Sequence, residues 1–456
     1  MLALSANGAP RWVRVASPHF EIYSSAGAGT ARDTLRQFEQ VRSFFIHMAG
    51  REPVNPAPVR IVAFGSDKEY DAVRFNEFAS AFYQPTADQD FIVMGPDTAG
   101  TAATAVHEYV HVVVRQGNLH FPPWLNEGIA ELYSTIRQHG DKVLVGSLIP
   151  RRQVELARTP WVRLAEILAA DQNSPLYNEK NKAGSLYNEG WALTHMLALR
   201  DEYSKKFPDY MVAVASGTDS AEAFGTVYGK SVAEVERDLL LYLRGERFQG
   251  RLIPMQMEKL SEKLEAGPVA PFDLDLTLAE IQNRRGHEAE SRARFQELIA
   301  RDGARPEPHA ELAYLEWRSG QSREALPEFG KAFQLGAHGS RFLWDYGRLA
   351  EREPARAIPV LGRLLEQEPE RIEVRLELAE VQLRARLPVD ALKTLATVRQ
   401  AGKADAARLF HTVALAAWQA GLKEQARAAA ESFRKIAASD VEKAEAERLV
   451  ALVAGQ

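Results

Sequence analysis

Five positions in the C-terminal part of the chain recur at a nearly constant spacing, and this spacing constrains the fold more than any other feature. Gly286, Gly320, Arg352, Arg386 and Gly421 follow one another at steps of 34, 32, 34 and 35 residues. A period of this length is typical of stacked helix pairs, in which each unit buries its apolar face against its neighbours. The residues from 272 onward are therefore expected to form an all-α solenoid.

Side chains at fixed distances from these positions have the sizes that packed helix pairs require. Five residues further on they are mostly small: Ser291, Ala325, Ala357, Ala391 and Ala426. Four residues beyond those they are mostly large: Phe295, Phe329, Leu361, Leu395 and Ala430. About five units, over roughly residues 272 to 437, resemble the tetratricopeptide repeat family, and the segment from 440 to 453 would be a capping helix. The resemblance implies a groove for an extended peptide or a protein partner.

The region before the repeats has another pattern, with short strands early and helices late. The predicted strands are 12–15, 19–23, 59–64 and 91–94, and the predicted helices include 30–48, 161–169, 185–199 and 231–243. We expect an α+β domain over residues 1–250, a linker over 251–271 that is punctuated by Pro and Gly, and the repeat domain over 272–456. A chain of 456 residues is long enough for two such domains.

Composition excludes several classes of protein and of site. The formal net charge of -5 gives no global argument for a nucleic-acid partner. There is no cysteine, so any metal must be bound by histidine and carboxylate groups. No uninterrupted apolar run approaches the roughly 18 residues of a membrane span, and the chain is expected to be soluble. The apolar start, Met1 to Ala6, is either the remnant of a removed signal peptide, which would mean export to the periplasm, or a loose terminus.

One short motif in the first region indicates a metal site. His107-Glu108-Tyr109-Val110-His111 is an H-E-x-x-H pattern within an Ala- and Val-rich stretch that predicts a buried helix. Residues four apart lie on one helical face, so both imidazoles point the same way. Buried polar groups need partners, and a metal ion would supply them. The motif therefore predicts a Zn2+ site with His107 and His111 as ligands.

A third ligand must come from another element, because a catalytic zinc site holds three protein ligands and leaves one position open. Glu127, in Trp124-Leu125-Asn126-Glu127-Gly128-Ile129-Ala130-Glu131, is the nearest suitable candidate. Pro122 and Pro123 break the first helix and allow a second helix to begin near Trp124, so the chain can fold back. Glu131 lies one helical turn beyond Glu127, where it can accept the free ring N–H of a histidine ligand and fix the ring orientation.

Two further residues have predicted roles in the hydrolysis of a peptide bond. Glu108 points about 100° away from His107 on the helix, near the metal but not bound to it, which is the place of a general base. Zinc lowers the pKa of its bound water to about 7, so Glu108 can take a proton as this water attacks a peptide carbonyl. Tyr187, on the helix predicted over 185–199, is the candidate donor for the oxyanion that results.

Together the two motifs resemble the gluzincin metallopeptidases, especially the bacterial peptidase MA-like group, in which W-L-x-E-G-x-A follows the H-E-x-x-H helix. The resemblance covers most of residues 11 to 245 and implies a zincin-like fold. It also implies His107, His111 and Glu127 as zinc ligands and Glu108 as the catalytic base. The distance along the chain from His111 to Glu127 is shorter than in the thermolysin-like members, which places the chain with the MA-like group.

Two functions fit the sequence. The first is a zinc-dependent peptidase whose repeats bind substrate or a partner protein. The second is a catalytically silent interaction or scaffold protein with a zinc-bearing domain. Glu108 favours the peptidase, because a chain that does not hydrolyse peptides is free to lose its base. His120, His139 and His195 lack a paired spacing and are interpreted as surface or core residues.

Overall fold

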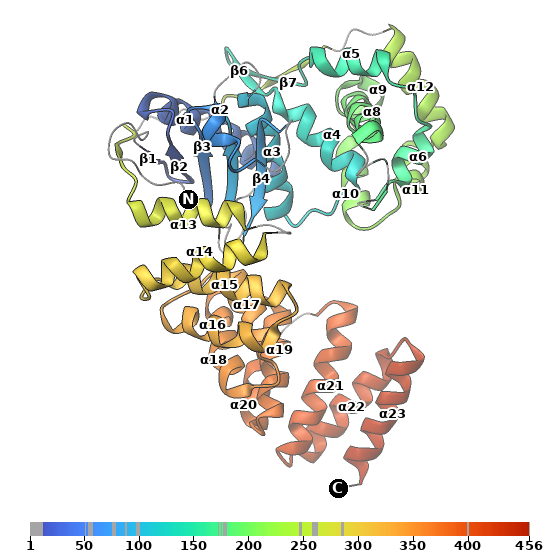
Figure 1. Cartoon of the computed structure of the whole chain (residues 1–456). Helices are drawn as coiled ribbons and strands as arrows, with labels where there is room; N and C mark the ends of the chain where they lie inside the picture. The colour runs from blue at the N-terminus through green and yellow to red at the C-terminus, as the bar shows by residue number, and fades with distance from the viewer. Residues whose placement is uncertain are drawn as a thin grey trace. The chain divides into compact units, whose positions relative to one another are not determined.

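The computed structural model divides into two compact units, Met1–Leu274 and Asp275–Gln456, and the division falls within helix α13 (Pro271–Gln282) (Figure 1). The residues that it describes are 12–50, 52, 58–74, 79–86, 89–96, 101–171, 173–174, 176, 180–245, 249–257, 263–283, 287–398 and 401–455. Two features of the sequence, the apolar start at Met1 to Ala6 and the repeat position Gly286, lie outside these residues.

The first unit contains a mixed sheet, which has six strands among the described residues. In spatial order they are β4 (Ala81–Pro85), β5 (Asp90–Met94), β3 (Val59–Ala63), β2 (Phe20–Ser24), β1 (Val13–Ala16) and β9 (Ala266–Pro268). The central strands β2, β3 and β5 are parallel, and β4, β1 and β9 are antiparallel to their neighbours. The four predicted strands are confirmed within one or two residues, whereas the strand β4 at the edge was not predicted.

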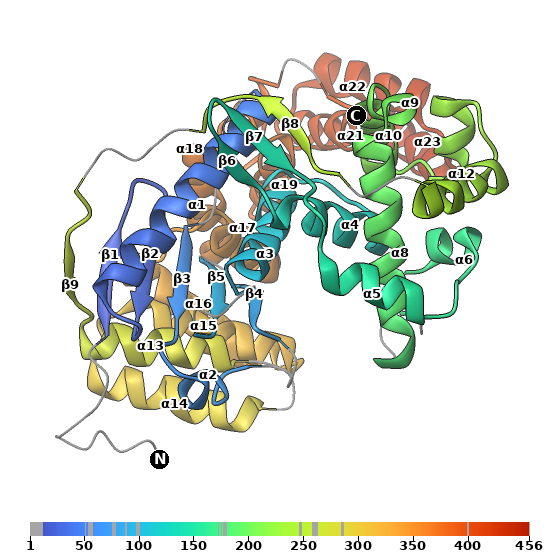
Figure 2. The same ribbon diagram turned by 90° about the horizontal axis from the view of Figure 1, so that it is seen from above.

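Two helices, α1 (Ala28–Ala49) and α3 (Thr101–Gln116), contact each other and pack on this sheet (Figures 1 and 2). α1 confirms the helix predicted over 30–48, and it ends at Gly50, whose φ of 68° a glycine adopts without strain. α3 joins two cores. Its residues Val106 and Val112 belong to the core beneath the sheet, and Val110 and Val114 belong to a second, helical core.

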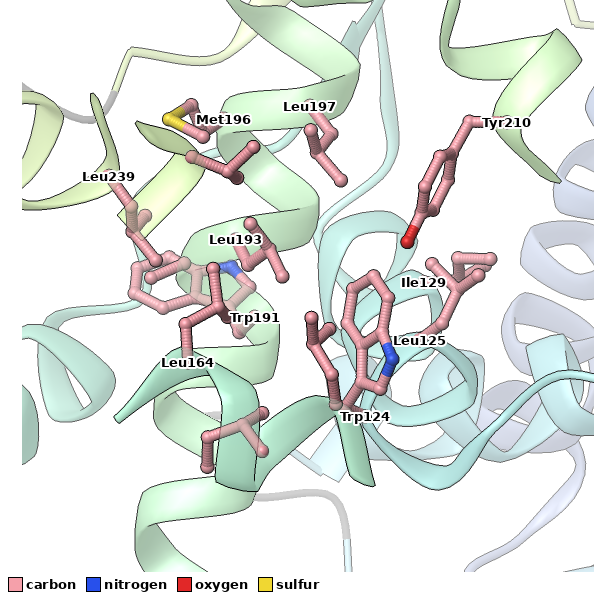
Figure 3. Packing of buried hydrophobic residues seen from close by; sticks show 14 of the residues in the cluster. Trp124, Leu125, Ile129, Leu164, Trp191, Leu193, Met196, Leu197, Tyr210 and Leu239 are labelled. Atoms are coloured by element: carbon pink, nitrogen blue, oxygen red, sulfur yellow. The ribbon is translucent and has the colours of Figure 1, made fainter. Parts of the chain in front are cut away.

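The helical core is built around α4 (Pro123–Ser134) and α8 (Lys180–Leu199), which pack against each other. Figure 3 shows Trp124 and Leu125 of α4 close to Leu193 and Trp191 of α8. Trp124 and Trp191 are fully buried. The other elements of the first unit are α2 (Asp67–Tyr70), α5 (Pro150–Arg158), α6 (Leu164–Ala169), α9 (Asp201–Ser204), α10 (Phe207–Ala215), α11 (Ser220–Ala223), the π-helix η1 (Phe224–Tyr228), α12 (Val232–Gly245), and a small antiparallel sheet of β6 (Arg137–His139), β7 (Lys142–Val145) and β8 (Arg251–Pro254).

The stretch 251–271, which the sequence predicts to be a linker, contains two strands of the first unit. β8 pairs with β7, and β9 pairs with β1. The linker prediction is therefore wrong for the described part of this stretch, and residues 258–262 lie outside it. The physical reason is that pairing with a distant strand satisfies the backbone of a short Pro- and Gly-containing segment, and composition does not reveal such a partner.

The second unit consists of helices that follow one another in antiparallel pairs. They are α14 (Glu288–Arg301), α15 (Pro306–Arg318), α16 (Ser322–Gln334), α17 (Ser340–Leu349), α18 (Pro354–Gln367), α19 (Ile372–Arg384), α20 (Pro388–Leu395), α21 (Lys403–Gln419), α22 (Lys423–Ile436) and α23 (Asp440–Ala454). The small and large repeat positions are all buried, as the repeat alignment predicts. Three of the aligned turns, at Gly320, Arg386 and Gly421, have positive φ.

Helix α23 follows the last of the predicted repeat units. It begins with a capping box between Ser439 and Glu442, and it packs against α22 and α21. The predicted capping helix is thus present. In the part of the chain that the structure describes, no helix has the length and apolar character needed to cross a membrane.

Candidate metal centre

The helix break at the two prolines brings α4 back against α3. α3 ends at Gln116, Asn118 turns the chain with a φ of 52°, and Pro123 opens α4. α3 and α4 then pack side by side. Gly128 permits a close crossing on the other side of α4, because a Cβ atom there would lie 2.7 Å from the carbonyl oxygen of Gly190 in α8. The residues before α4 therefore turn the chain, and Gly128 within α4 allows the close packing against α8.

Three predicted ligands converge between these helices. The Nε2 atoms of His107 and His111 lie 3.2 Å apart, and Oε2 of Glu127 lies 3.3 Å from the first and 3.6 Å from the second. The ligand atoms of a tetrahedral zinc ion, each about 2.0–2.1 Å from it, are separated by about 3.3 Å. The donor set, two imidazoles and a carboxylate, and its spacing therefore fit a zinc ion with one position left for water.

The electrostatics of this cluster indicate a place for a positive charge. Burial lowers the pKa of His107, but the hydrogen bond with Glu127 and the nearby carboxylates outweigh it and raise that pKa to about 9. Burial raises the pKa of Glu127, but hydrogen bonds with His107 and His111 outweigh it and lower that pKa to about 2. In the metal-free chain a proton on His107 thus balances the Glu127 carboxylate, and zinc would displace this proton on binding.

The second ring nitrogens of the two histidines face polar groups from α4. Nδ1 of His107 lies 3.7 Å from Oε1 of Glu131, and Nδ1 of His111 lies 3.2 Å from the side-chain amide of Asn126. An amide can turn by 180° so that its oxygen accepts the ring N–H. The Asn126 contact is of the kind that orients a histidine ligand, and the spacing of the motif did not identify it. Glu131 lies beside the ring of His107, but 3.7 Å is longer than a hydrogen bond, so its orienting role stays a prediction.

Arg152 of α5 extends this network. Its Nε donates to Oε1 of Glu131 at 3.1 Å, its Nη2 contacts the same oxygen, and its Nη1 donates to Oδ1 of Asn188 at 3.1 Å. The guanidinium also lies 5.6 Å from the centre of the Tyr187 ring. One partly buried arginine thus contacts Glu131 and Tyr187, two residues that the sequence singles out.

The candidate base lies in the same cavity, which has a volume of about 640 Å³ and is lined by the three predicted ligands, Glu108 and Tyr187. Oε2 of Glu108 accepts a hydrogen bond of 3.0 Å from the backbone N–H of Tyr83 in β4. Burial raises the pKa of Glu108, although the neighbouring histidines lower it. Tyr187 is half-buried and lines this cavity.

Two residues around the candidate centre carry no local sequence signal. Tyr83 lines the cavity and Arg152 contacts Glu131, and no fixed offset from the H-E-x-x-H motif points to either residue. The aromatic pair Phe82-Tyr83 ahead of Pro85 is a weak indication of an edge strand. His195 is a core residue as predicted: its Nε2 donates to the Gly146 carbonyl at 2.9 Å. The other two single histidines, His120 and His139, are exposed.

The comparisons with known proteins concern the repeats. A model of the tetratricopeptide repeat family matches residues 348–418. Similar solved structures include YrrB, described as a TPR protein with an unusual peptide-binding site (16% identity, 38% of this chain and 90% of that chain, TM-score 0.33), and MamA from Desulfovibrio magneticus RS-1 (17%, 39% and 95%, 0.27). A tetratricopeptide repeat protein from Parabacteroides merdae is another (11%, 56% and 99%, 0.22). No curated protein matches the chain. The match to the family model shows that the chain contains tetratricopeptide repeats, and this match does not extend to the first unit.

Proposed function

We propose that the chain is a zinc-dependent peptidase whose tetratricopeptide repeats bind a substrate or another protein. The observation that supports this most is the convergence of His107, His111 and Glu127 in one cavity with Glu108. These three residues would hold the ion, and Glu131 would orient the ring of His107. When bound, zinc would lower the pKa of a water molecule and polarise the carbonyl of a peptide.

The side chains around the cavity would move the protons and stabilise the charge. Glu108 accepts a proton from the attacking water and passes it to the amine that leaves, and its raised pKa makes it a stronger acceptor. The Tyr83 N–H holds one carboxylate oxygen of Glu108 in place. The Tyr187 hydroxyl group, at the wall of the cavity, would donate to the oxyanion.

The sheet offers a means of holding an extended peptide. β4 stands at one end of the strand order, so one of its edges pairs with β5 and the other has no strand beside it among the described residues. The N–H of Tyr83 points from β4 to Glu108, hence this open edge faces the cavity. An exposed strand edge binds extended peptides through main-chain hydrogen bonds. A peptide laid along β4 would pass beside the candidate base.

Zinc content and peptide cleavage in the wild type and in Glu108→Gln test the proposal. We expect one zinc per chain in both proteins, cleavage of members of a diverse peptide library by the wild type, and a loss of cleavage of at least about 100-fold in the variant, because general-base catalysis contributes at least that much. The proposal is wrong if the fully zinc-loaded wild type cuts no peptide, or if Glu108→Gln cuts as fast as the wild type.

A second function is a protein-interaction scaffold whose zinc-bearing domain does not hydrolyse peptides. The match of residues 348–418 to the tetratricopeptide repeat family favours it, because solenoids of such repeats present extended surfaces to partner proteins. The two functions share the repeats and differ in the role of Glu108. The cleavage experiment therefore separates them, since a scaffold would bind zinc and leave every peptide intact.

A further inference from the structure

A cationic side chain, Arg115, lines the same cavity as Glu108. The two residues are seven apart on α3, so they lie on nearly the same helical face, two turns from each other. Both are bound to one residue of the edge strand: the Tyr83 N–H donates to Glu108, and the Tyr83 hydroxyl oxygen accepts from Nη1 of Arg115 at 2.7 Å. Tyr83 thus fixes the base and the cation at a defined separation.

A buried carboxylate binds one of the three nitrogen atoms of the Arg115 guanidinium. Nη1 of Arg115 pairs with Oδ1 of Asp90, whose side chain is fully buried at the start of β5. Tyr83 donates its hydroxyl hydrogen to the same oxygen at 2.9 Å, and Gln116 donates to the other oxygen, Oδ2, at 3.1 Å. The Asp90 carboxylate is therefore satisfied by three donors, and it occupies only Nη1 of the arginine.

The rest of the guanidinium is available to a bound molecule. Nε and Nη2 of Arg115 have no hydrogen-bond partner in the described part of the chain, and 35% of the side chain is exposed. We infer that Arg115 binds a carboxylate of the peptide substrate, because the free edge formed by Nε–H and Nη2–H of a guanidinium matches the two oxygens of that group. This inference rests on the proposed peptidase function, since it names the class of peptide that the same cavity accepts.

The separation along α3 determines where on the peptide this carboxylate lies. Seven residues of helix span about 10 Å, and an extended peptide advances about 3.3 Å per residue. A peptide beside β4 would therefore bring a carboxylate to Arg115 from about two or three residues away from the cleaved bond. Glu108 and Glu127 repel an acidic group at the other end of the cavity, so the preference is confined to the Arg115 end.

Two sources can supply this carboxylate: an acidic side chain or the C-terminus of the peptide. Sets of otherwise identical fluorogenic peptides distinguish them, with Glu or Gln at each of the three positions on either side of the cleaved bond, and with a free or an amidated C-terminus. We expect one acidic form to be cleaved with a kcat/KM at least about tenfold above its neutral form, as a charge-assisted pair allows. A preference for the free C-terminus would mean cleavage near the end of the substrate.

Arg115→Met should abolish this preference, so that within this variant the kcat/KM of the acidic form lies within about threefold of that of the neutral form, since the pair contributes about tenfold only where both charges are present. In Arg115→Met the buried carboxylate of Asp90 loses its cationic partner. The double variant Asp90→Asn/Arg115→Met also removes the charge of that carboxylate and so provides a second test. Arg163→Met is the matched control, since the Arg163 side chain is 79% exposed and, among the described residues, its ion pair is with Glu166, three positions further along the chain. This control should keep the full preference.

Binding separates failure of this inference from failure of the peptidase proposal. Zinc-loaded Glu108→Gln should bind the preferred acidic peptide more tightly than its neutral form by fluorescence anisotropy, and adding Arg115→Met should remove the difference. If the wild type cleaves nothing but this binding difference is seen, the carboxylate site stands and the peptidase proposal falls. If the wild type cleaves acidic and neutral peptides equally, or Arg115→Met slows both by the same factor, Arg115 does not select a carboxylate.

Discussion

Replacing Arg152 by methionine tests how far the candidate centre depends on a residue outside it. Arg152 and Glu131 form a pair whose side chains are 13% and 11% exposed. Removing one partner of a buried pair costs about 3–5 kcal/mol, because the remaining charge is left uncompensated. We expect the lower value, a decrease of about 3 kcal/mol in the free energy of unfolding of the zinc-free chain. The reason is that the imidazole of His107, 3.7 Å from Glu131, still compensates part of the carboxylate charge. Zinc affinity should fall by roughly 10- to 100-fold, since Glu131 then holds the ring of His107 less firmly.

A double-mutant cycle measures this dependence directly. Urea unfolding of the wild type, Arg152→Met, Glu131→Gln and the double variant can be followed by tryptophan fluorescence, and zinc affinity by competition with a chelator. Residues in contact should show a coupling energy of about 2 kcal/mol, because Glu131→Gln removes the charge that Arg152→Met leaves unpaired. The exposed pair Arg163 and Glu166 serves as the control cycle, with an expected coupling below about 0.5 kcal/mol. Additive effects at Arg152 and Glu131, or unchanged zinc affinity in Arg152→Met, would refute the reasoning.

Three further predictions concern the ligands and the core. Glu127→Ala removes one of three donor atoms and should weaken zinc binding by at least about 100-fold in chelator competition, beyond the usual effect of an orienting residue; unchanged affinity would remove Glu127 from the ligand set. Gly128→Ala should lower stability by about 1–3 kcal/mol in urea unfolding, since the new Cβ meets Thr194 and the Gly190 carbonyl; an unchanged midpoint would contradict the close helix crossing. Burial lowers the pKa of His195 to about 4, although the Gly146 carbonyl raises it, so the unfolded chain binds a proton below about pH 6.5 that the folded chain does not. Stability should therefore fall by about 2–3 kcal/mol between pH 6.5 and 4.5, and by less in His195→Gln; equal falls would exclude His195 as the cause.

The repeats show where sequence periodicity is sufficient to predict structure. Each unit contacts mainly its neighbours, so a small residue such as Ala325 and a large one such as Phe329 report packing that lies within one period of the chain. The same holds for α1, α3 and α4, whose limits follow from local apolar spacing and from the prolines at 122 and 123. In each case the interactions that determine the structure are close in the sequence.

The linker prediction and the missed strand β4 show the opposite case. Whether the stretch 251–271 joins a sheet depends on its partner strands β7 and β1. In the sequence, β7 lies more than a hundred residues before β8, and β1 lies more than two hundred residues before β9. β4 is a short edge strand whose aromatic residues also fit a loop, and only its pairing with β5 distinguishes the two. Non-local pairing of this kind leaves little trace in composition or periodicity.

The residues of the candidate metal centre also fall into two groups, those that the sequence predicts and those that only the tertiary structure reveals. His107, His111 and Glu127 were predicted from the sequence alone, because helical geometry sets the spacing of the two histidines and a proline break lets the third ligand return. Glu108 and Glu131 follow from the same two helices. Only the tertiary structure places Tyr83 against Glu108 and Arg152 against Glu131, and only it brings Arg115 to the wall of the cavity. The physical reason is that helical geometry, which is local, determines which metal ligands share one face of a helix. The residues that orient those ligands or bind the substrate come from elements distant in the sequence, and only tertiary packing brings them beside the metal centre.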